Sequence, residues 1–203
     1  MHISEGVLSA PVLISGGVLS AAGVYFGLKK LDNERIPLVA LISAAFFVAS
    51  LIHVPLGPTS VHLILNGLAG ILLGWAAFPA ILIGLFLQAI LFQFGGLTTL
   101  GVNTFNMAFP SIIVYYMFMF FKNSNNKTVV MIGEYLAGFL SVFFSAILVG
   151  ASLYFTGQSF LKVAELTVMA HIPVMIIEGF ITLIVVEFLR KVKPEMLEME
   201  KLK

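Results

Sequence analysis

The first two residues of the chain, Met1 and His2, bring several nitrogen donors close together. With a free amino terminus, the α-amine and the His2 amide nitrogen close a five-membered ring around a metal ion. The same amide nitrogen and the imidazole Nδ1 close a six-membered ring, so the three nitrogens lie roughly in one plane. Planar nitrogen sites suit Ni(II) and Cu(II), and Co(II) can use the same ligands, whereas Mg and Ca prefer oxygen. We therefore predict a metal site here, although an isolated histidine at position 2 is usually just a solvated residue.

A fourth nitrogen would complete the square, and the chain has three other histidines: His53, His62 and His171. His62 is the preferred candidate, because the Pro- and Gly-containing turn at residues 54–60 leaves the backbone free to bend inward. The hydroxyls of Thr59 and Ser60 would orient its ring. The other two histidines are possible substitutes, and any histidine at a helix end can also be an interfacial residue with no ligand.

Other polar groups interrupt the apolar sequence. His171 and Glu178 are seven residues apart and fall on one helical face, so they form a proton relay or polar seam, or Glu178 is a hydrogen-bonded packing residue; the second interpretation is preferred. The Gly- and Thr-rich stretch 95–104 is expected to fold over the outer pocket, since non-helical backbone at this depth must be covered by protein or line a cavity. Asn103 and Asn106 would then bind the N-terminal segment. The full set of predicted pocket residues is Glu5, Thr59, Ser60, Asn103 and Asn106.

The composition decides what kind of protein must position these groups. Of 203 residues, 60% are hydrophobic and 10% charged, against about 25% charged in a soluble domain. The mean hydropathy is +1.06. These values exclude a water-soluble globular domain and predict an all-α, multi-pass protein of the cell membrane. The net charge of +1 indicates no nucleic-acid partner, and the absence of cysteine excludes disulfides and thiolate metal sites.

We predict one domain, residues 1–203, with seven transmembrane helices, each of about 20 residues. Their expected ranges are 7–28, 37–52, 61–78, 79–94, 105–121, 129–155 and 166–189. With the N-terminus outside and the C-terminus inside, ten of the eleven Lys and Arg residues face inward, as the positive-inside rule requires. All four histidines then lie on the external side. We expect the native terminus to be retained and the N-terminal segment to fold into an external pocket.

Several blocks of this sequence resemble the CbiM/NikM family. The blocks are residues 1–6, 57–62, 95–107, 171–173 with 178–179, and 191–196. That family comprises the substrate-capture subunits of energy-coupling-factor transporters for cobalt and nickel, and its fold is a seven-helix bundle. The resemblance implies that the Met1 amine, the His2 amide nitrogen and imidazole, and His62 bind the metal. It also implies that Asn103 and Asn106 support the buried terminus.

The resemblance also implies partners. They are a membrane coupling subunit, two cytoplasmic ATPase subunits and a small accessory membrane subunit. The chain has no Walker motif, so we expect a transporter subunit rather than an enzyme. No cofactor is expected, because Co(II) or Ni(II) is the substrate. The segment Thr59-Ser60-Val61-His62-Leu63 is closer to the nickel-type pattern, whereas the tail resembles cobalt-type chains, so the metal stays open.

Three alternative functions lead to different expectations. An intramembrane metalloprotease would need a His-Glu-x-x-His motif, and a retinal protein would need a lysine in the last span; the sequence has neither. A structural membrane module that binds no metal would tolerate replacement of both His2 and His62 without loss of metal uptake.

Overall fold

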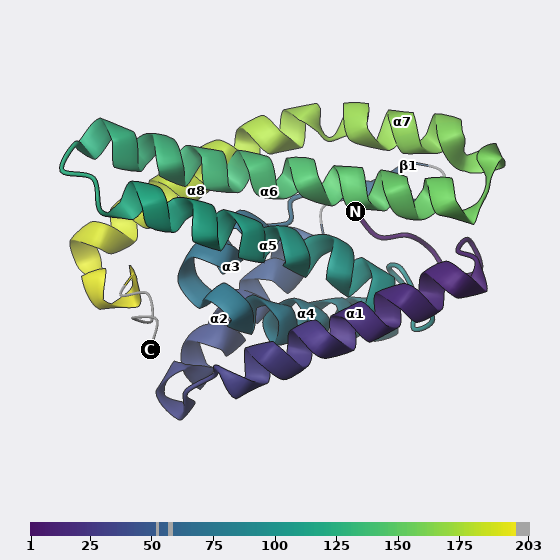
Figure 1. Cartoon of the computed structure of the whole chain (residues 1–203), viewed down its shortest axis with the longest axis horizontal. Coiled ribbons are helices and arrows are strands. Elements are labelled where there is room, and N and C mark those ends of the chain that lie inside the picture. Colours follow the sequence, from purple (N-terminus) through teal and green to yellow (C-terminus); the bar gives the residue numbers. More distant parts are fainter. Residues whose placement is uncertain (52, 57–58, 198–203) are drawn as a thin grey trace.

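The computed structural model describes residues 1–51, 53–56 and 59–197, and it consists mainly of long helices (Figure 1). The helices are α1 (Ala10–Lys29), α2 (Ile36–Ala49), α3 (Asn66–Leu73), α4 (Ala77–Phe92), α5 (Leu100–Lys122), α6 (Lys127–Thr156), α7 (Leu161–Ala170) and α8 (Ile172–Val192). Two short strands, β1 (His53–Leu56) and β2 (Thr59–His62), form an antiparallel pair. Short 3₁₀ turns lie at Asn33–Arg35, Gly74–Ala76, Gln158–Phe160 and Pro194–Leu197.

Five helical stretches among the described residues are long and apolar enough to cross a membrane. They are Ala10–Lys29, Asn66–Phe92, Leu100–Lys122, Lys127–Thr156 and Gln158–Val192. A helix satisfies its own backbone hydrogen bonds, as it must in the hydrocarbon core of a bilayer, where no water is available to bond backbone groups. Large apolar side chains on their outer faces, such as Ile14, Phe120 and Ile184, are exposed in the isolated chain. The protein is therefore a multi-pass membrane protein, whereas the count of seven spans and their orientation stay predictions.

Several of the predicted spans have other boundaries in the structure, and two differ most. The span predicted at 61–78 begins in strand β2 and continues without helix to Leu65. It contains the eight-residue helix α3 and ends in the first residues of α4. A 3₁₀ turn at Gly74–Ala76 then joins α3 to α4. The last predicted span is broken at His171 into α7 and α8, with Pro173 in the first turn of α8. A proline there has no backbone N–H to donate, so it ends one helix and starts the next.

The centre of the bundle is formed by α5 and α6. Helices α1, α3 and α4 pack on α5, and α8 packs along α6. The α1–α5 approach is close, because Gly17 faces Gly101 and the Ser20 hydroxyl donates to the Gly101 carbonyl at 2.5 Å. Small residues at such crossings let backbones meet in a membrane. Asn66, fully buried at the start of α3, donates to α5 and α6 and ties the three helices together.

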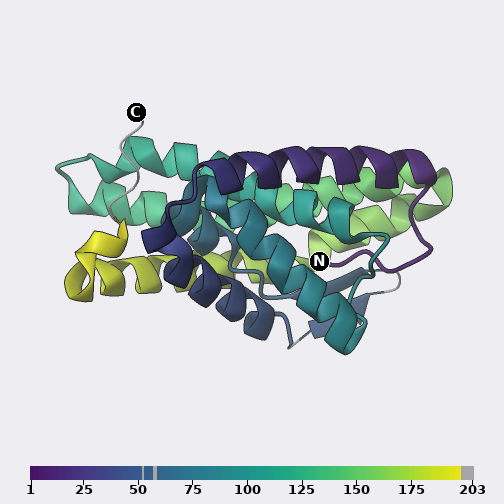
Figure 2. The same ribbon diagram turned by 90° about the horizontal axis from the view of Figure 1, so that it is seen from below.

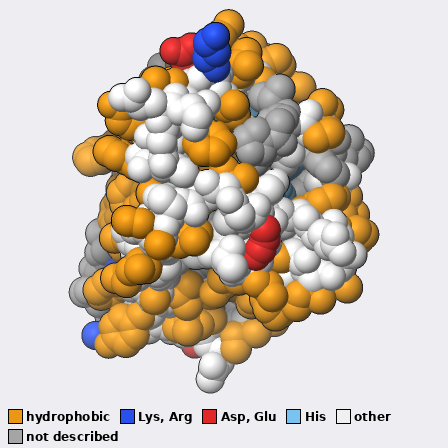
Figure 3. All heavy atoms as spheres, turned by 90° about the vertical axis from the view of Figure 1, so that its right-hand side faces the viewer, with side chains coloured by type: hydrophobic (Ala, Val, Ile, Leu, Met, Phe, Trp, Pro, Cys, Tyr) orange, Lys and Arg blue, Asp and Glu red, His pale blue; other side chains and the backbone are white. Residues whose placement is uncertain are grey.

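The two ends of the bundle differ in charge. The start of α1, β1 and the α6–α7 turn lie at one end, and the α5–α6 loop and the end of α8 lie at the other (Figure 1). Ion pairs gather at the second end, where Arg190 pairs with Glu134 and Glu187, and Lys127 with Glu187. The first end shows few charged side chains among uncharged ones (Figure 3). The residues before α1 turn back into the bundle, so the N-terminus lies inside it in both views (Figures 1 and 2).

Candidate metal centre

The N-terminal segment is held in the bundle interior by backbone and side-chain hydrogen bonds. Met1 and Ile3 are fully buried, and His2 nearly so. Asn103 on α5 pairs with Ile3 twice: its Oδ1 accepts from the Ile3 amide at 2.9 Å, and its Nδ2 donates to the Ile3 carbonyl at 3.1 Å. The Glu5 amide donates to the Gly95 carbonyl, and the Glu5 carboxylate accepts from the Thr98 amide at 2.8 Å. Asn103 and the segment at 95–98 thus hold the terminal residues. The stretch 95–104 was expected to be non-helical throughout, but its residues from Leu100 onward belong to α5.

Three nitrogen atoms converge at this buried terminus. The Nε2 atom of His62 lies 2.5 Å from the Met1 amine and 3.1 Å from Nδ1 of His2. For metal–nitrogen bonds of about 2.0–2.1 Å, neighbouring corners of a square are about 2.9 Å apart. Nε2 of His62 therefore lies where the fourth nitrogen of a square would lie, next to both the Met1 amine and Nδ1 of His2. No group of three His, Cys, Asp or Glu side chains suited to a metal occurs in the described part of the chain, and this cluster combines two imidazoles with the amine.

Hydrogen bonds on the far side of each ring set which nitrogen carries the proton. His2 Nε2–H donates to Oε1 of Gln88 at 2.6 Å, and His62 Nδ1–H donates to the Leu63 carbonyl at 2.6 Å. The lone pairs of His2 Nδ1 and His62 Nε2 consequently point into the cluster beside the amine. Far-side partners of this kind orient metal-binding histidines and fix their tautomer. The arrangement can offer unprotonated imidazole nitrogens to a cation.

Burial disfavours the charged forms of the Met1 amine and His62. Removal from water lowers the pKa of the Met1 α-amine well below its ordinary value. The pKa of His62 is also lowered well below its ordinary value, first by burial and then by the Met1 amine, His2 and His171. Desolvation disfavours the charged form of an amine or imidazole. The lowered pKa values favour the neutral forms of both groups, which are the forms that bind a metal ion.

A cavity of about 160 Å³ opens beside His2 and is lined mainly by uncharged polar groups and backbone. Its lining residues are His2, Ser4, Pro55, Thr59, Ser60, Gln93, Phe94 and Gly95. Thr59 and Ser60 were expected to orient the ring of His62, but the Leu63 carbonyl holds that ring. Among the described residues, the buried Thr59 hydroxyl has no hydrogen-bond partner. These two residues are thus pocket residues rather than ring supports.

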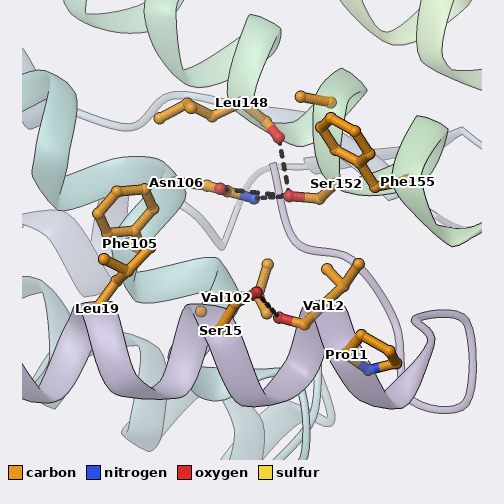
Figure 4. A pocket seen from close by; sticks show the side chains of 12 residues that line it. Pro11, Val12, Ser15, Leu19, Val102, Phe105, Asn106, Leu148, Ser152 and Phe155 are labelled. Carbon is orange, nitrogen blue, oxygen red and sulfur yellow. Dashed lines mark hydrogen bonds between the residues drawn. The ribbon is translucent and has the colours of Figure 1, made fainter.

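Asn106 lies away from the terminus, contrary to expectation. It lies in the second turn of α5 and pairs with Ser152 of α6 at 3.1 Å instead of binding the N-terminal segment. This pair lies in an apolar groove of about 570 Å³ between α1, α5 and α6 (Figure 4). The reason is that α5 starts at Leu100, earlier than the span predicted from 105. Asn103 and Asn106 are therefore one helical turn apart, and the terminal segment reaches the first of them.

The remaining predicted polar residues have separate places. His171 is fully buried, and its Nδ1 donates to the Thr167 carbonyl at 2.6 Å. Glu178 accepts from the backbone amides of Ile64 and Leu65 rather than from His171, which matches the packing interpretation and not a relay. His53 faces His62 across the strand pair, and its side chain lies outside the described part of the chain.

Gln88 was not among the site residues predicted from the sequence. This residue of α4 is fully buried; it accepts from His2 and its amide donates to the Ser50 hydroxyl. The sequence held a signal for this residue. The predicted span 79–94 contains two side-chain amides, Gln88 and Gln93, and Gln88 is the one that does not lie at the end of the span. Polar residues inside a span are costly and tend to be functional.

The fold and the buried nitrogen cluster define a helical membrane protein built around its own amino terminus. A family model described as "Cobalt uptake substrate-specific transmembrane region", that of CbiM, matches residues 2–196. The chain belongs to this family. It is 47% identical over 205 residues to a Haemophilus influenzae protein assigned to metal transport, with 97% of each chain covered.

Other similarities agree with this family. The cobalt transport protein CbiM of Clostridium tetani is 36% identical over 211 residues, which cover 94% of this chain and 85% of that protein. A crystal structure of a truncated transition metal transporter superposes with a TM-score of 0.74 at 30% identity, covering 95% of this chain and 99% of that one. The chain is thus a membrane component of the cobalt and nickel transport family.

Proposed function

We propose that this chain is the metal-capture subunit of an ATP-driven energy-coupling-factor importer for cobalt or nickel. Its ligands are the Met1 amine, the amide nitrogen and Nδ1 of His2, and Nε2 of His62. The observation that carries the proposal is the pair of nitrogen–nitrogen distances, 2.5 and 3.1 Å, at the corner occupied by His62. Both are close to the separation of about 2.9 Å that adjacent ligands adopt in a square of metal–nitrogen bonds.

Capture proceeds from the polar cavity beside His2. Its hydroxyl and amide oxygens replace part of the water around an arriving ion, and the ion then reaches the inward-facing lone pairs. The His2 amide releases its proton to water as the chelate closes, because its nitrogen has a free electron pair only after deprotonation. The buried surroundings lower the pKa of the amine and of His62 and so favour their neutral, metal-binding forms. Little rearrangement is needed, since Asn103 and Glu5 hold the segment in place.

Transport needs the partner subunits. A membrane coupling subunit, two cytoplasmic ATPase subunits and a small accessory membrane subunit would convert ATP hydrolysis into release of the ion to the cytoplasm. In the proposed orientation the nitrogen cluster faces outward, because the basic residues lie toward the opposite end of the bundle. Square-planar nitrogen geometry favours Ni(II), and Co(II) accepts the same ligands.

The decisive experiment compares the purified protein bearing its native Met1 with a variant extended by two residues at the N-terminus. Extension converts the amine into an amide and adds atoms where Met1 has no exposed surface. Each protein is titrated with Ni(II) and Co(II), and bound metal and visible absorption are followed. We expect one equivalent of nickel with a yellow, square-planar-type band in the native protein only.

A matched control carries the same two residues at the C-terminus and should bind as the native protein does. Equal binding by the native and the N-terminally extended proteins would remove the terminus from the ligand set. In cells that contain the whole transporter, the His2→Ala, His62→Ala double variant should lose nickel and cobalt accumulation. Unchanged accumulation would favour the structural-module alternative.

A further inference from the structure

The segment between His62 and α3 is attached to α8 by a single side chain. Ile64 and Leu65 lie between strand β2 and helix α3, and Leu65 has a left-handed backbone with φ of 56°. Both of their amides donate to the same oxygen, Oε1 of Glu178, at 2.5 and 2.9 Å. One oxygen that accepts from two successive backbone amides holds both residues at a fixed distance from α8.

Glu178 is itself rigidly placed. It is fully buried in α8, and α8 packs along α6 where Gly138 faces the Glu178 backbone carbonyl. A side chain added at Gly138 would collide with that carbonyl, so the two helices meet at close range. The position of the acceptor oxygen is therefore set by the α6–α8 pair, the most extensive helix contact in the bundle.

The peptide group between Leu63 and Ile64 links this oxygen to His62 through one hydrogen bond on each side. Glu178 holds the amide of Ile64, whose neighbour Leu63 supplies the carbonyl that accepts from Nδ1 of His62. That bond orients the ring so that Nε2 faces the Met1 amine. A displacement of the 63–65 backbone therefore moves the corner of the square that His62 occupies.

We propose that Glu178 is a positioning residue of the metal centre, which sets the place and orientation of His62 through the backbone of residues 63–65. The proposal rests on the function proposed above. Glu178 does not touch the ion, and its role is carried by one acceptor oxygen rather than by its charge. Both amides converge on Oε1, whereas Oε2 has no hydrogen-bond partner among the residues that the structure describes.

The contrast between acceptor and charge gives the test. Glu178→Gln retains an oxygen at the Oε1 position, whereas Glu178→Met has similar length and no comparable acceptor. We expect Glu178→Gln to bind Ni(II) with native affinity and the native absorption band. We expect Glu178→Met to bind about 10–100-fold more weakly, the usual loss when the support of a metal ligand is removed. Its absorption band should shift toward that of His62→Ala.

Glu134→Met is the matched control. Glu134 is also a fully buried carboxylate, but it pairs with Arg190 at the opposite end of the bundle. This variant should lower the unfolding temperature and leave the nickel band unchanged. If Glu178→Met does not fold, Glu178→Asp keeps the charge and withdraws the oxygen by one methylene group, and it should likewise weaken binding and shift the band.

Two results would overturn the proposal. One is native affinity and native absorption in both Glu178→Met and Glu178→Asp. The other is equal damage in Glu178→Gln and Glu178→Met, which would assign the role to the charge or to a proton. Failure of the proposed function itself is distinguishable, because the native and N-terminally extended proteins would then bind metal equally before any Glu178 variant is considered.

Discussion

Replacing Gln88 by Leu should weaken nickel binding by about 10–100-fold while leaving every proposed ligand in place. The Gln88 side-chain oxygen accepts the proton on Nε2 of His2 at 2.6 Å, and this bond leaves Nδ1 free to face the metal position. Leu has a similar volume and offers no acceptor. The perturbation thus tests the tautomer argument without removing a ligand.

The size of the effect follows from the two protonation forms of the ring. Without an acceptor at Nε2, the metal-free protein can move the His2 proton to Nδ1, where Nε2 of His62 lies 3.1 Å away and can accept it. Metal binding forces the proton back to Nε2, now buried against Leu. A buried donor without a partner costs about 1–3 kcal/mol, and about 1.4 kcal/mol corresponds to a tenfold change in affinity.

Affinity is measured by titrating the detergent-purified protein with Ni(II) in the presence of a competing chelator. Asn106→Leu is the control, because it also replaces a buried amide by Leu, but its partner is Ser152 and not the terminus. The Gln88→Glu variant supplies a carboxylate acceptor in place of the amide oxygen, so it should retain tight binding. Native affinity in Gln88→Leu would refute the tautomer argument, and equal losses in both Leu variants would point to general destabilisation.

Three further predictions concern protons, the terminal segment and packing. Lowered pKa values favour the neutral Met1 amine and His62, so we expect nickel to displace only one backbone amide proton. Log affinity should then rise by about one per pH unit above pH 7 in titrations at several pH values. A slope near two would show that the amine still carries its proton. Asn103→Leu removes both hydrogen bonds to the Ile3 backbone. The unpaired Ile3 amide and carbonyl each cost about 1–3 kcal/mol of stability, so titration should show at least about tenfold weaker nickel binding. An unchanged affinity would show that these bonds are dispensable. Gly16→Leu should lower stability by about 1–3 kcal/mol, because even a Cβ there would lie 2.5 Å from Val102; an unchanged thermal midpoint in detergent would contradict close α1–α5 packing.

Local chemistry and composition were enough to predict the Met1–His2 donor set, the membrane class and the long apolar helices. A Met1–His2 chelate needs only neighbouring atoms, so its donor set is visible in two letters of sequence. The membrane class follows from an excess of apolar residues that no soluble fold could bury. The helices at 100–122 and 127–156 match predicted apolar runs within a few residues, because continuous apolar sequence in hydrocarbon has to be helical.

The partners of each polar side chain were decided only by the tertiary structure. Gln88 meets His2 across 86 positions of sequence, and Glu178 meets Ile64 across 114. No periodicity encodes such distances, because a polar residue in a span needs some partner but its position does not say which one. The short α3 has the same origin, whereas the break at His171 follows from Pro173 in the sequence itself. Backbone can leave the helix at membrane depth only where side chains from other segments take up its amides, as Glu178 does.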